Sequence, residues 1–399
     1  MKYVLVLCDG MADFKIDKLG GKTPLEAAYK PNIDIMAKTA LIGRVDTVPK
    51  GMKPGSDVAN LSALGYDAKA CYTGRSPLEA LSLGIDMQKG DVALRCNVVT
   101  LSDDEPYEAK TMIDYSSGEI STAEAAELIK AVEEKLGNDL LKFYAGVSYR
   151  HCLICKNGLT NSELTPPHDI TNKPIKDYLP KGDNAKLYLD LMKKSEDILK
   201  NHPVNLKRIA EGKNPATSIW LWGQGTRPKL ENFKQRYGID GAMISAVDLL
   251  KGIAIGGGMK SIDVEGATGT IDTNFDGKAA AAIKTLAEES DFCFIHLEAP
   301  DECGHQGDVD GKKHSIELID EKIIGTILKA FKGSDLAMLV MPDHFTPIST
   351  RTHDGTPVPF LMYSSKEKLG NHETFNEDEG LKGELFTPQN LIKKFFALN

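Results

Sequence analysis

The sequence predicts an α/β protein: a mainly parallel sheet flanked by helices, with a smaller α+β domain inserted into it. Three observations lead to this prediction. Short continuous apolar runs alternate with helical stretches along most of the chain, as in a parallel sheet that is covered on both faces. The stretch 91–212 has a different order of elements, and polar side chains directly follow several of the apolar runs.

The expected core strands are short apolar runs, and the first of them ends abruptly at Asp9-Gly10. These strands are expected at Lys2–Leu7, Ser218–Trp222, Ala242–Ser245, Phe292–Leu297, Leu336–Met341 and Val358–Tyr363. Helical patterns are expected between them, at Leu230–Tyr237, Lys278–Glu289 and Ser315–Phe331. Such alternation predicts strand–helix units and a sheet with parallel neighbours.

The insertion is expected over 91–212, so that the core comprises 1–90 and 213–399. Two strands and two helices are expected in it, at Asp91–Leu101, Tyr149–Cys155, Thr122–Leu136 and Leu187–Lys200. Strands and helices in this order favour a small α+β domain, which we expect to act as a substrate-binding lid.

Composition narrows the class of protein. The formal net charge is -9, from 48 basic and 57 acidic residues, which argues against nucleic-acid binding because that needs a concentrated positive face. No apolar run approaches the roughly 20 residues that span a bilayer. The 7 cysteines are scattered, so we expect a cytoplasmic protein without disulfides. The sequence leaves open whether the protein is a homo-oligomer.

Polar residues at the ends of expected strands form the strongest functional signal. Ligands of open α/β sheets bind at the carboxyl ends of the strands, and candidate metal ligands follow three of them: Asp9, Asp301, His305, Asp343, His344 and His353. Mixed carboxylate and imidazole ligands suit zinc or manganese, with magnesium or cobalt as further options. The pattern predicts a site for two divalent ions, which would clamp the oxygens of an in-line displacement.

Ser56 is the candidate nucleophile. It follows the glycine- and proline-rich loop Gly51–Gly55 and precedes a helix expected to begin near Asp57. Backbone N–H groups at a helix N-terminus can hold a phosphate. The alternative is that Ser56 only caps this helix, which its position fits equally well.

Several motifs together resemble one family. They are Asp9, Gly55–Leu61 (GSDVANL), Tyr72–Ala80 (YTGRSPLEA), Asp301-x-x-x-His305, Asp343-His344 and His353-x-x-x-Pro357-Val358-Pro359-Phe360. In this order they resemble the archaeal-type cofactor-independent phosphoglycerate mutases of the alkaline phosphatase superfamily. The resemblance implies an alkaline phosphatase-like core and a transient phosphoserine at Ser56, without 2,3-bisphosphoglycerate.

The resemblance also implies roles for individual residues. One metal would be held by Asp301, His305 and His353, and the other by Asp9, Asp343 and His344, with Ser56 as a shared or adjacent ligand. Arg75, Arg150, His151 and Asp169 would bind the phosphoglycerate, and Asp169 or His151 would move protons on and off its hydroxyl groups.

Two departures from the family pattern leave alternatives open. Glu298-Ala299-Pro300 stands where a lysine is expected before the metal-binding aspartate, and Trp220–Gly225 lacks an expected arginine. At both places the sequence resembles a divergent bacterial branch of the family that is proposed to act as a homoserine kinase. The first interpretation is a mutase that interconverts 3-phosphoglycerate and 2-phosphoglycerate. The alternatives are a homoserine kinase-like phosphotransferase and a non-catalytic phosphometabolite-binding protein.

Overall fold

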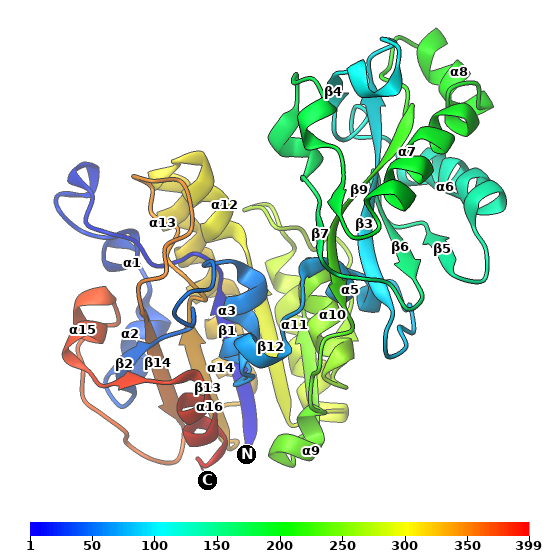
Figure 1. Cartoon of the computed structure of the whole chain (residues 1–399). Coiled ribbons are helices and arrows are strands. Elements are labelled where there is room, and N and C mark those ends of the chain that lie inside the picture. Colours follow the sequence, from blue (N-terminus) through cyan, green and yellow to red (C-terminus); the bar gives the residue numbers. More distant parts are fainter. Residues whose placement is uncertain (399) are drawn as a thin grey trace. The chain divides into compact units, whose positions relative to one another are not determined.

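The structure, a computed structural model that describes residues 1–398, separates into two units (Figure 1). Unit 1 comprises 1–72 and the residues from 229 onward, and unit 2 comprises 73–228. The insertion expected at 91–212 lies within unit 2, which extends beyond it at both ends. The extensions belong to unit 2 because helix α5 (Arg75–Ser82) packs on strands β3 and β9 of that unit.

Unit 1 contains an eight-stranded sheet in the order β11-β10-β12-β1-β13-β14-β2-β15. All neighbouring strands are parallel except β14, which runs antiparallel to both β13 and β2. This confirms the predicted α/β class with a mainly parallel sheet. The strands are β1 (Lys2–Cys8), β2 (Leu41–Val45), β10 (Gly241–Ile244), β11 (Lys260–Ile262), β12 (Phe292–Leu297), β13 (Leu336–Met341), β14 (Val358–Ser364) and β15 (Leu385–Phe386).

The central strand β1 is buried on both faces, which explains its unbroken apolar sequence. On one face, Val4 and Val6 belong to a core that includes residues of helices α2 and α11. On the other face, the ring of Tyr3 makes edge contacts with Phe395 and Phe396 of helix α16, at centroid distances of 5.4 and 5.2 Å.

Helices cover this sheet (Figure 1). They are α1 (Pro24–Ala27), α2 (Pro31–Ala37), α3 (Ser56–Ala63), α4 (Ala68–Cys71), α9 (Phe233–Tyr237), α10 (Asp248–Gly256), α11 (Phe275–Glu288), α12 (Ala299–Gln306), α13 (Val309–Leu318), α14 (Thr326–Ala330), α15 (Glu377–Lys382) and α16 (Pro388–Phe396), with a short turn η1 (Asp17–Leu19). Within residues 1–398, no helix has the length and apolar character needed to cross a bilayer.

The helix expected over 315–331 is interrupted by a π-helical segment, η5 (Ile319–Gly325). The buried Asp320 in this segment accepts hydrogen bonds from the backbone N–H groups of Asn32 and Ile33, at 3.2 and 2.7 Å. It thereby satisfies free donors in the first turn of α2. The irregular segment therefore serves a local contact that the apolar spacing alone does not reveal.

Unit 2 is built on an antiparallel sheet in which β3 pairs with β4, β6 and β9, and β6 pairs with β5. The prediction that Ser218–Trp222 belongs to the parallel core sheet is wrong, because this segment begins β9, and its Ile219, Trp220 and Leu221 are buried in the core of unit 2. The elements are α5, β3 (Val92–Leu101), η2 (Tyr107–Ala109), β4 (Met112–Asp114), α6 (Thr122–Leu136), β5 (Leu141–Tyr144), β6 (Arg150–Cys155), β7 (Ser162–Glu163), η3 (Pro167–Ile170), η4 (Lys176–Tyr178), β8 (Lys181–Gly182), α7 (Ala185–Leu199), α8 (Pro203–Ala210) and β9 (Ser218–Thr226).

Candidate active site

Three adjacent strands of unit 1 deliver acidic side chains to one edge of the sheet. β12, β1 and β13 lie side by side and run parallel, so their carboxyl ends meet at this edge. Asp9 follows β1 and Asp343 follows β13, while α12 begins just after β12 and carries Asp301. The parallel topology therefore produces the convergence that the sequence predicts.

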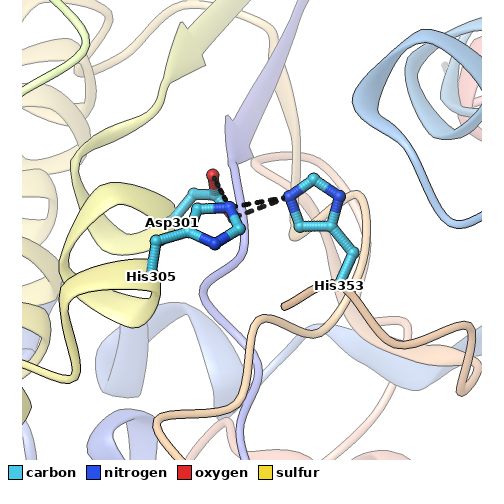
Figure 2. Close-up of side chains that lie close together, drawn as sticks. All are labelled: Asp301, His305 and His353. Atoms are coloured by element: carbon cyan, nitrogen blue, oxygen red, sulfur yellow. Dashed lines mark hydrogen bonds and ion pairs between the residues drawn. The ribbon is translucent and has the colours of Figure 1, made fainter. Parts of the chain in front are cut away.

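The first cluster consists of Asp301, His305 and His353 (Figure 2). His305 Nε2 lies 3.2 Å from Asp301 Oδ2 and 3.0 Å from His353 Nε2, and His353 Nε2 lies 3.5 Å from Asp301 Oδ1. Asp301 and His305 are one turn apart on α12, which places both side chains on one face of the helix. The ring nitrogen Nδ1 of His305 lies 2.9 Å from the carbonyl oxygen of Arg351, and this contact orients the ring.

The second cluster consists of Asp9, Asp301 and His344. His344 Nε2 lies 3.5 Å from Asp9 Oδ1. Asp301 therefore belongs to both clusters, whereas the resemblance assigns it to one. Asp343 lies beside the second cluster, with its Oδ2 3.4 Å from His344 Nε2.

The carboxylate of Asp343 accepts several hydrogen bonds. Its Oδ1 accepts from the backbone N–H groups of Gly10 and His344, at 3.1 and 2.8 Å. Its Oδ2 accepts from Asn60 Nδ2 at 3.0 Å. Asp343 thus ties the loop after β1 to helix α3 and to its own loop.

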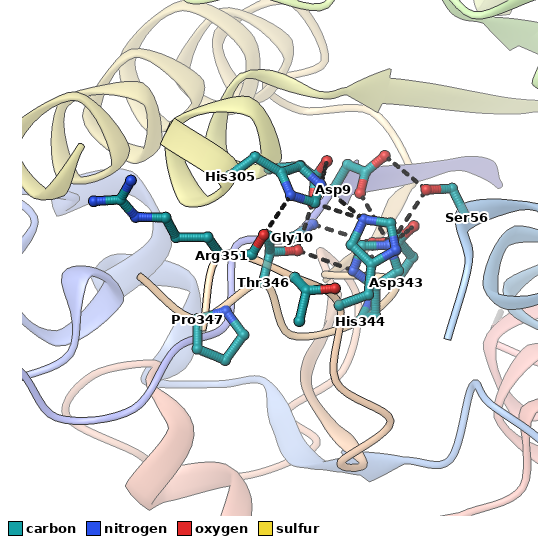
Figure 3. A network of polar contacts seen from close by, with 12 residues as sticks. Asp9, Gly10, Ser56, His305, Asp343, His344, Thr346, Pro347 and Arg351 are labelled. Atoms are coloured by element: carbon teal, nitrogen blue, oxygen red, sulfur yellow. Dashed lines mark hydrogen bonds and ion pairs between the residues drawn. The ribbon is translucent and has the colours of Figure 1, made fainter. Parts of the chain in front are cut away.

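Ser56 faces the second cluster (Figure 3). Its Oγ lies 3.2 Å from His344 Nε2 and 3.5 Å from Asp9 Oδ2. The residue is the first of helix α3, the capping position is Gly55, and the helix has no side-chain cap. The alternative that Ser56 only caps its helix is therefore wrong, and its hydroxyl is directed at the charged cluster instead.

The buried acids carry unequal pKa values. Burial raises the pKa of Asp9, and the negative charges of Asp343 and Asp301 raise it further. Burial also opposes ionisation of Asp301, but hydrogen bonds from His305 and His353 outweigh it and lower its pKa. The hydrogen bond to Asp301 raises the pKa of His305 to about 9. A cation bound beside these carboxylates would favour their ionised forms.

The two clusters fit divalent cations. In each, one ligand atom per residue lies within 4.8 Å of the others. Ligands about 2.0–2.1 Å from a tetrahedral metal stand about 3.4 Å apart, and the separations in the first cluster are 3.0, 3.2 and 3.5 Å. In the second cluster, Asp9 Oδ1 is buried and has no hydrogen-bond partner among the described residues, so it is available as a ligand.

His296 is a site residue that sequence reasoning missed. It lies in β12 and is buried, and its Nε2 stands 2.8 Å from Asp9 Oδ2. Its Nδ1 stands 3.2 Å from Ser245 Oγ, and burial lowers the pKa of the ring to about 3. A neutral ring with Nε2 protonated can donate to Asp9 while it accepts from Ser245, so His296 orients the carboxylate. In the sequence, His296 lies inside an apolar run, which indicates a buried strand but not a contact with Asp9.

Thr346 is a second such residue, two positions after His344. Its hydroxyl donates to Asp301 Oδ1 and lies 3.2 Å from Nδ1 of His344. It thereby connects the two clusters. The only hint in the sequence is its place within the Asp343-His344 loop.

The proposed substrate residues lie in unit 2. Arg75 forms an ion pair with Glu79 at 3.0 Å. Arg150 and Asp169 are exposed to solvent, whereas His151 is only 4% exposed. His151 Nδ1 accepts from the backbone N–H of Gly146 at 3.0 Å, and burial lowers its pKa to about 3. His151 is therefore neutral, with a proton on Nε2, and only Asp169 of the two proton-transfer candidates is open to solvent.

Comparisons with known proteins agree with this chemistry. The family model described as 2,3-bisphosphoglycerate-independent phosphoglycerate mutase matches residues 37–205. The chain is 51% identical to the protein of that name from Methanosarcina barkeri, over 96% of each chain. It is 48% identical to a probable enzyme of the same name from Geobacter sulfurreducens, over 92% of this chain and 91% of the relative.

Solved structures agree as well. A protein from Pyrococcus horikoshii matches with a TM-score of 0.81 and 29% identity, over 99% of this chain and 96% of the other. A cofactor-independent phosphoglycerate mutase from Thermoplasma acidophilum matches with a TM-score of 0.69 and 25% identity, over 99% of both chains. Since its motifs, its site and its full-length relatives agree, the chain belongs to the family of 2,3-bisphosphoglycerate-independent phosphoglycerate mutases.

Proposed function

We propose that this chain interconverts 3-phosphoglycerate and 2-phosphoglycerate through a phosphorylated Ser56. The observation that carries the proposal is the position of the Ser56 hydroxyl, 3.2 Å from His344 Nε2 and 3.5 Å from Asp9 Oδ2, beside two clusters that fit cations. Full-length relatives that carry the mutase name support the choice of substrate.

The transfer has two balanced steps. Ser56 Oγ, having lost its proton, attacks the phosphorus of 3-phosphoglycerate, and the bond from phosphorus to the 3-oxygen breaks as that oxygen takes a proton. The 2-hydroxyl of the retained glycerate then loses a proton as its oxygen attacks the phosphorus of phosphoserine, and the bond from phosphorus to Ser56 Oγ breaks as Oγ takes a proton. No bisphosphorylated cofactor is needed, because the enzyme itself carries the phosphate between the two hydroxyl groups.

Two divalent ions are proposed for the site. Asp301, His305 and His353 would hold one, and Asp9 and His344, with Asp301 or Asp343, would hold the other. When bound, such ions lower the pKa of a hydroxyl group and neutralise phosphate charge. The mixed ligands favour zinc or manganese.

The protein's own groups prepare the site for this chemistry. His296 fixes the orientation of Asp9, and Asp343 ties the loop after β1 to α3 through Gly10 and Asn60. In unit 2, Arg75 and Arg150 are proposed to hold the anionic substrate. Asp169 is proposed to move a proton at the glycerate hydroxyl groups, since it is exposed and His151 is buried.

Glu298 supports one alternative substrate. Its negative charge contributes to the raised pKa of Asp9, so it lies near the cluster. The added negative charge suits a zwitterionic amino acid better than a multiply charged phosphoglycerate, as a homoserine kinase-like activity requires. A coupled assay on one metal-loaded preparation decides: we expect turnover of 3-phosphoglycerate and none of homoserine with ATP. The reverse result would replace the mutase with the kinase, and activity on neither would favour a binding protein.

A further inference from the structure

A cavity of about 280 Å³ in unit 1 is lined by residues of the loops that follow Asp9, His344 and His353, and by residues of β2, β14 and α15. Its apolar walls are formed by Phe14, Phe345, Pro357, Pro359 and Leu381. The rings of Phe14 and Phe345 are stacked, with centroids 5.3 Å apart and planes 28° apart. Phe14 and Leu381 are 45% and 59% exposed, so the cavity presents apolar surface to solvent.

The ionisable groups at this cavity have ion-pair or hydrogen-bond partners, with one exception. Lys15 pairs with Asp378 at 2.9 Å, and Asp13 pairs with Lys312 at 2.8 Å. The carboxylate of Glu377 accepts from the backbone N–H of Asp13 at 3.1 Å and from the hydroxyl of Thr23 at 2.6 Å.

The exception is Arg44, which reaches the cavity from strand β2. Its Nε is buried and has no hydrogen-bond partner within residues 1–398, and no described carboxylate pairs with its guanidinium group. Arg44 lines the cavity, and its terminal guanidinium nitrogens are not among the buried unpaired atoms of the described residues, so they are the donors that a ligand in the cavity can reach. The cavity thus combines apolar walls with one cation that lacks a counterion.

We propose that this cavity binds an organic monoanion with a small, flat apolar body, such as an aromatic carboxylate. The guanidinium group of Arg44 would hold the carboxylate through charge-assisted hydrogen bonds, and the body would lie against Phe14, Phe345 and the prolines. The volume is just below the roughly 300 Å³ at which ligand pockets usually start, so the ligand is no larger than about one ring. The nearby carboxylates disfavour a multiply charged phosphate.

Occupancy of the cavity would act on the metal-binding loops, because Phe345 joins them. It follows His344 directly, and its backbone forms bridges with Met11 and Ala12, which follow Asp9, and with Asp354, which follows His353. The carbonyl of Phe345 accepts from the N–H of Asp354 at 2.9 Å. A ligand that shifts Phe345 therefore changes the affinity of the site for metal, and by linkage metal changes the affinity for the ligand.

The test measures binding of 4-fluorobenzoate to the full-length, metal-loaded protein by fluorine NMR. Saturable binding is expected, weakened at least about tenfold in Arg44→Met, which removes the charge-assisted hydrogen bonds. The neutral isostere 4-fluorobenzamide should also bind less tightly. Lys260→Met, which removes a cation at the opposite edge of the same sheet, should bind the probe as the unmodified protein does.

Leu381→Asp provides a second test that does not depend on the folding of Arg44→Met, since Leu381 is exposed and the new carboxylate would repel the probe. Equal affinity in all variants, or no saturable binding, would overturn the proposal.

Metal titrations with and without the probe test the coupling between the cavity and the metal site. We expect the probe to change the metal affinity by about fivefold, and an unchanged metal affinity would contradict the coupling. These readouts measure binding alone, so they hold or fail independently of the mutase function.

Discussion

The ammonium nitrogen of Lys312 lies 2.8 Å from Asp13 Oδ2, in an ion pair whose side chains are 0% and 1% exposed. The same nitrogen donates to the carbonyl oxygens of Ala12 and Thr346, at 3.2 and 2.9 Å. Ala12 lies in the loop that follows Asp9, and Thr346 in the loop that follows His344. One buried cation therefore joins the two loops that carry Asp9 and His344 of the second cluster.

Lys312→Met should lower the free energy of unfolding by about 3–5 kcal/mol, because it leaves Asp13 as an uncompensated buried charge. It should also weaken metal binding, since the two loops lose their common donor. Urea denaturation and metal titration against a competing chelator measure the two effects.

Lys18→Met is the matched control for Lys312→Met. Lys18 also forms an ion pair, with Asp310 at 2.7 Å, but the two side chains are 61% and 71% exposed. Its removal should therefore lower the free energy of unfolding by less than about 1 kcal/mol and leave metal binding unchanged. If both variants behave alike, Lys312 does not organise the loops.

Asp301→Asn should reduce the metal content more than His305→Ala or His353→Ala does. The reason is that Asp301 belongs to both clusters, whereas each of these histidines belongs to one. Elemental analysis of the purified variants after dialysis gives metal per chain. We expect loss of both ions from Asp301→Asn and retention of one by each histidine variant, and equal losses in all three would refute the sharing.

The raised pKa of Glu377 predicts that the stability of the folded protein depends on pH. Burial raises its pKa from 4.5 to about 7, so between these values the folded protein holds a proton that the unfolded chain has lost. Rising pH therefore destabilises the folded state across this window, and the full cost is present above it. Glu377→Gln, which stays neutral, should gain stability relative to the unmodified protein as pH rises from 4.5 to 7.

Guanidinium denaturation at several pH values measures this difference. Glu379→Gln is the control, because hydrogen bonds from Lys382 and His372 lower the pKa of Glu379, so its ionisation does not oppose folding in that window. A stability difference for Glu377→Gln that does not vary with pH would mean that Glu377 is not the titrating group.

Ser56→Ala should abolish turnover while leaving the fold intact, because the hydroxyl of Ser56 makes no helix-capping hydrogen bond. The loss should be in kcat, and the thermal midpoint should change little. Ser62→Ala, on the same helix, should retain activity. A Ser56→Ala enzyme with more than trace turnover would exclude Ser56 as the nucleophile.

The sequence was informative about the site where a candidate metal ligand directly follows an expected strand. Asp9 and Asp343 each follow an unbroken apolar run, so their convergence at one edge of a parallel sheet could be predicted. Ser218–Trp222 shows the limit of this reasoning, because an apolar run fits the core of either unit and only tertiary pairing assigns it. His296 and Lys312 were not predictable, since their roles depend on contacts with residues about 300 positions away.

The central claim is that phosphate passes through Ser56, and a rapid acid quench during turnover tests it most directly. Metal-loaded enzyme would be mixed with 3-phosphoglycerate, quenched within its first turnovers, digested and analysed by mass spectrometry. The account predicts a phosphorylated peptide that contains Ser56, together with 2-phosphoglycerate and little free phosphate. Formation of 2-phosphoglycerate without any phosphate on that peptide would contradict it.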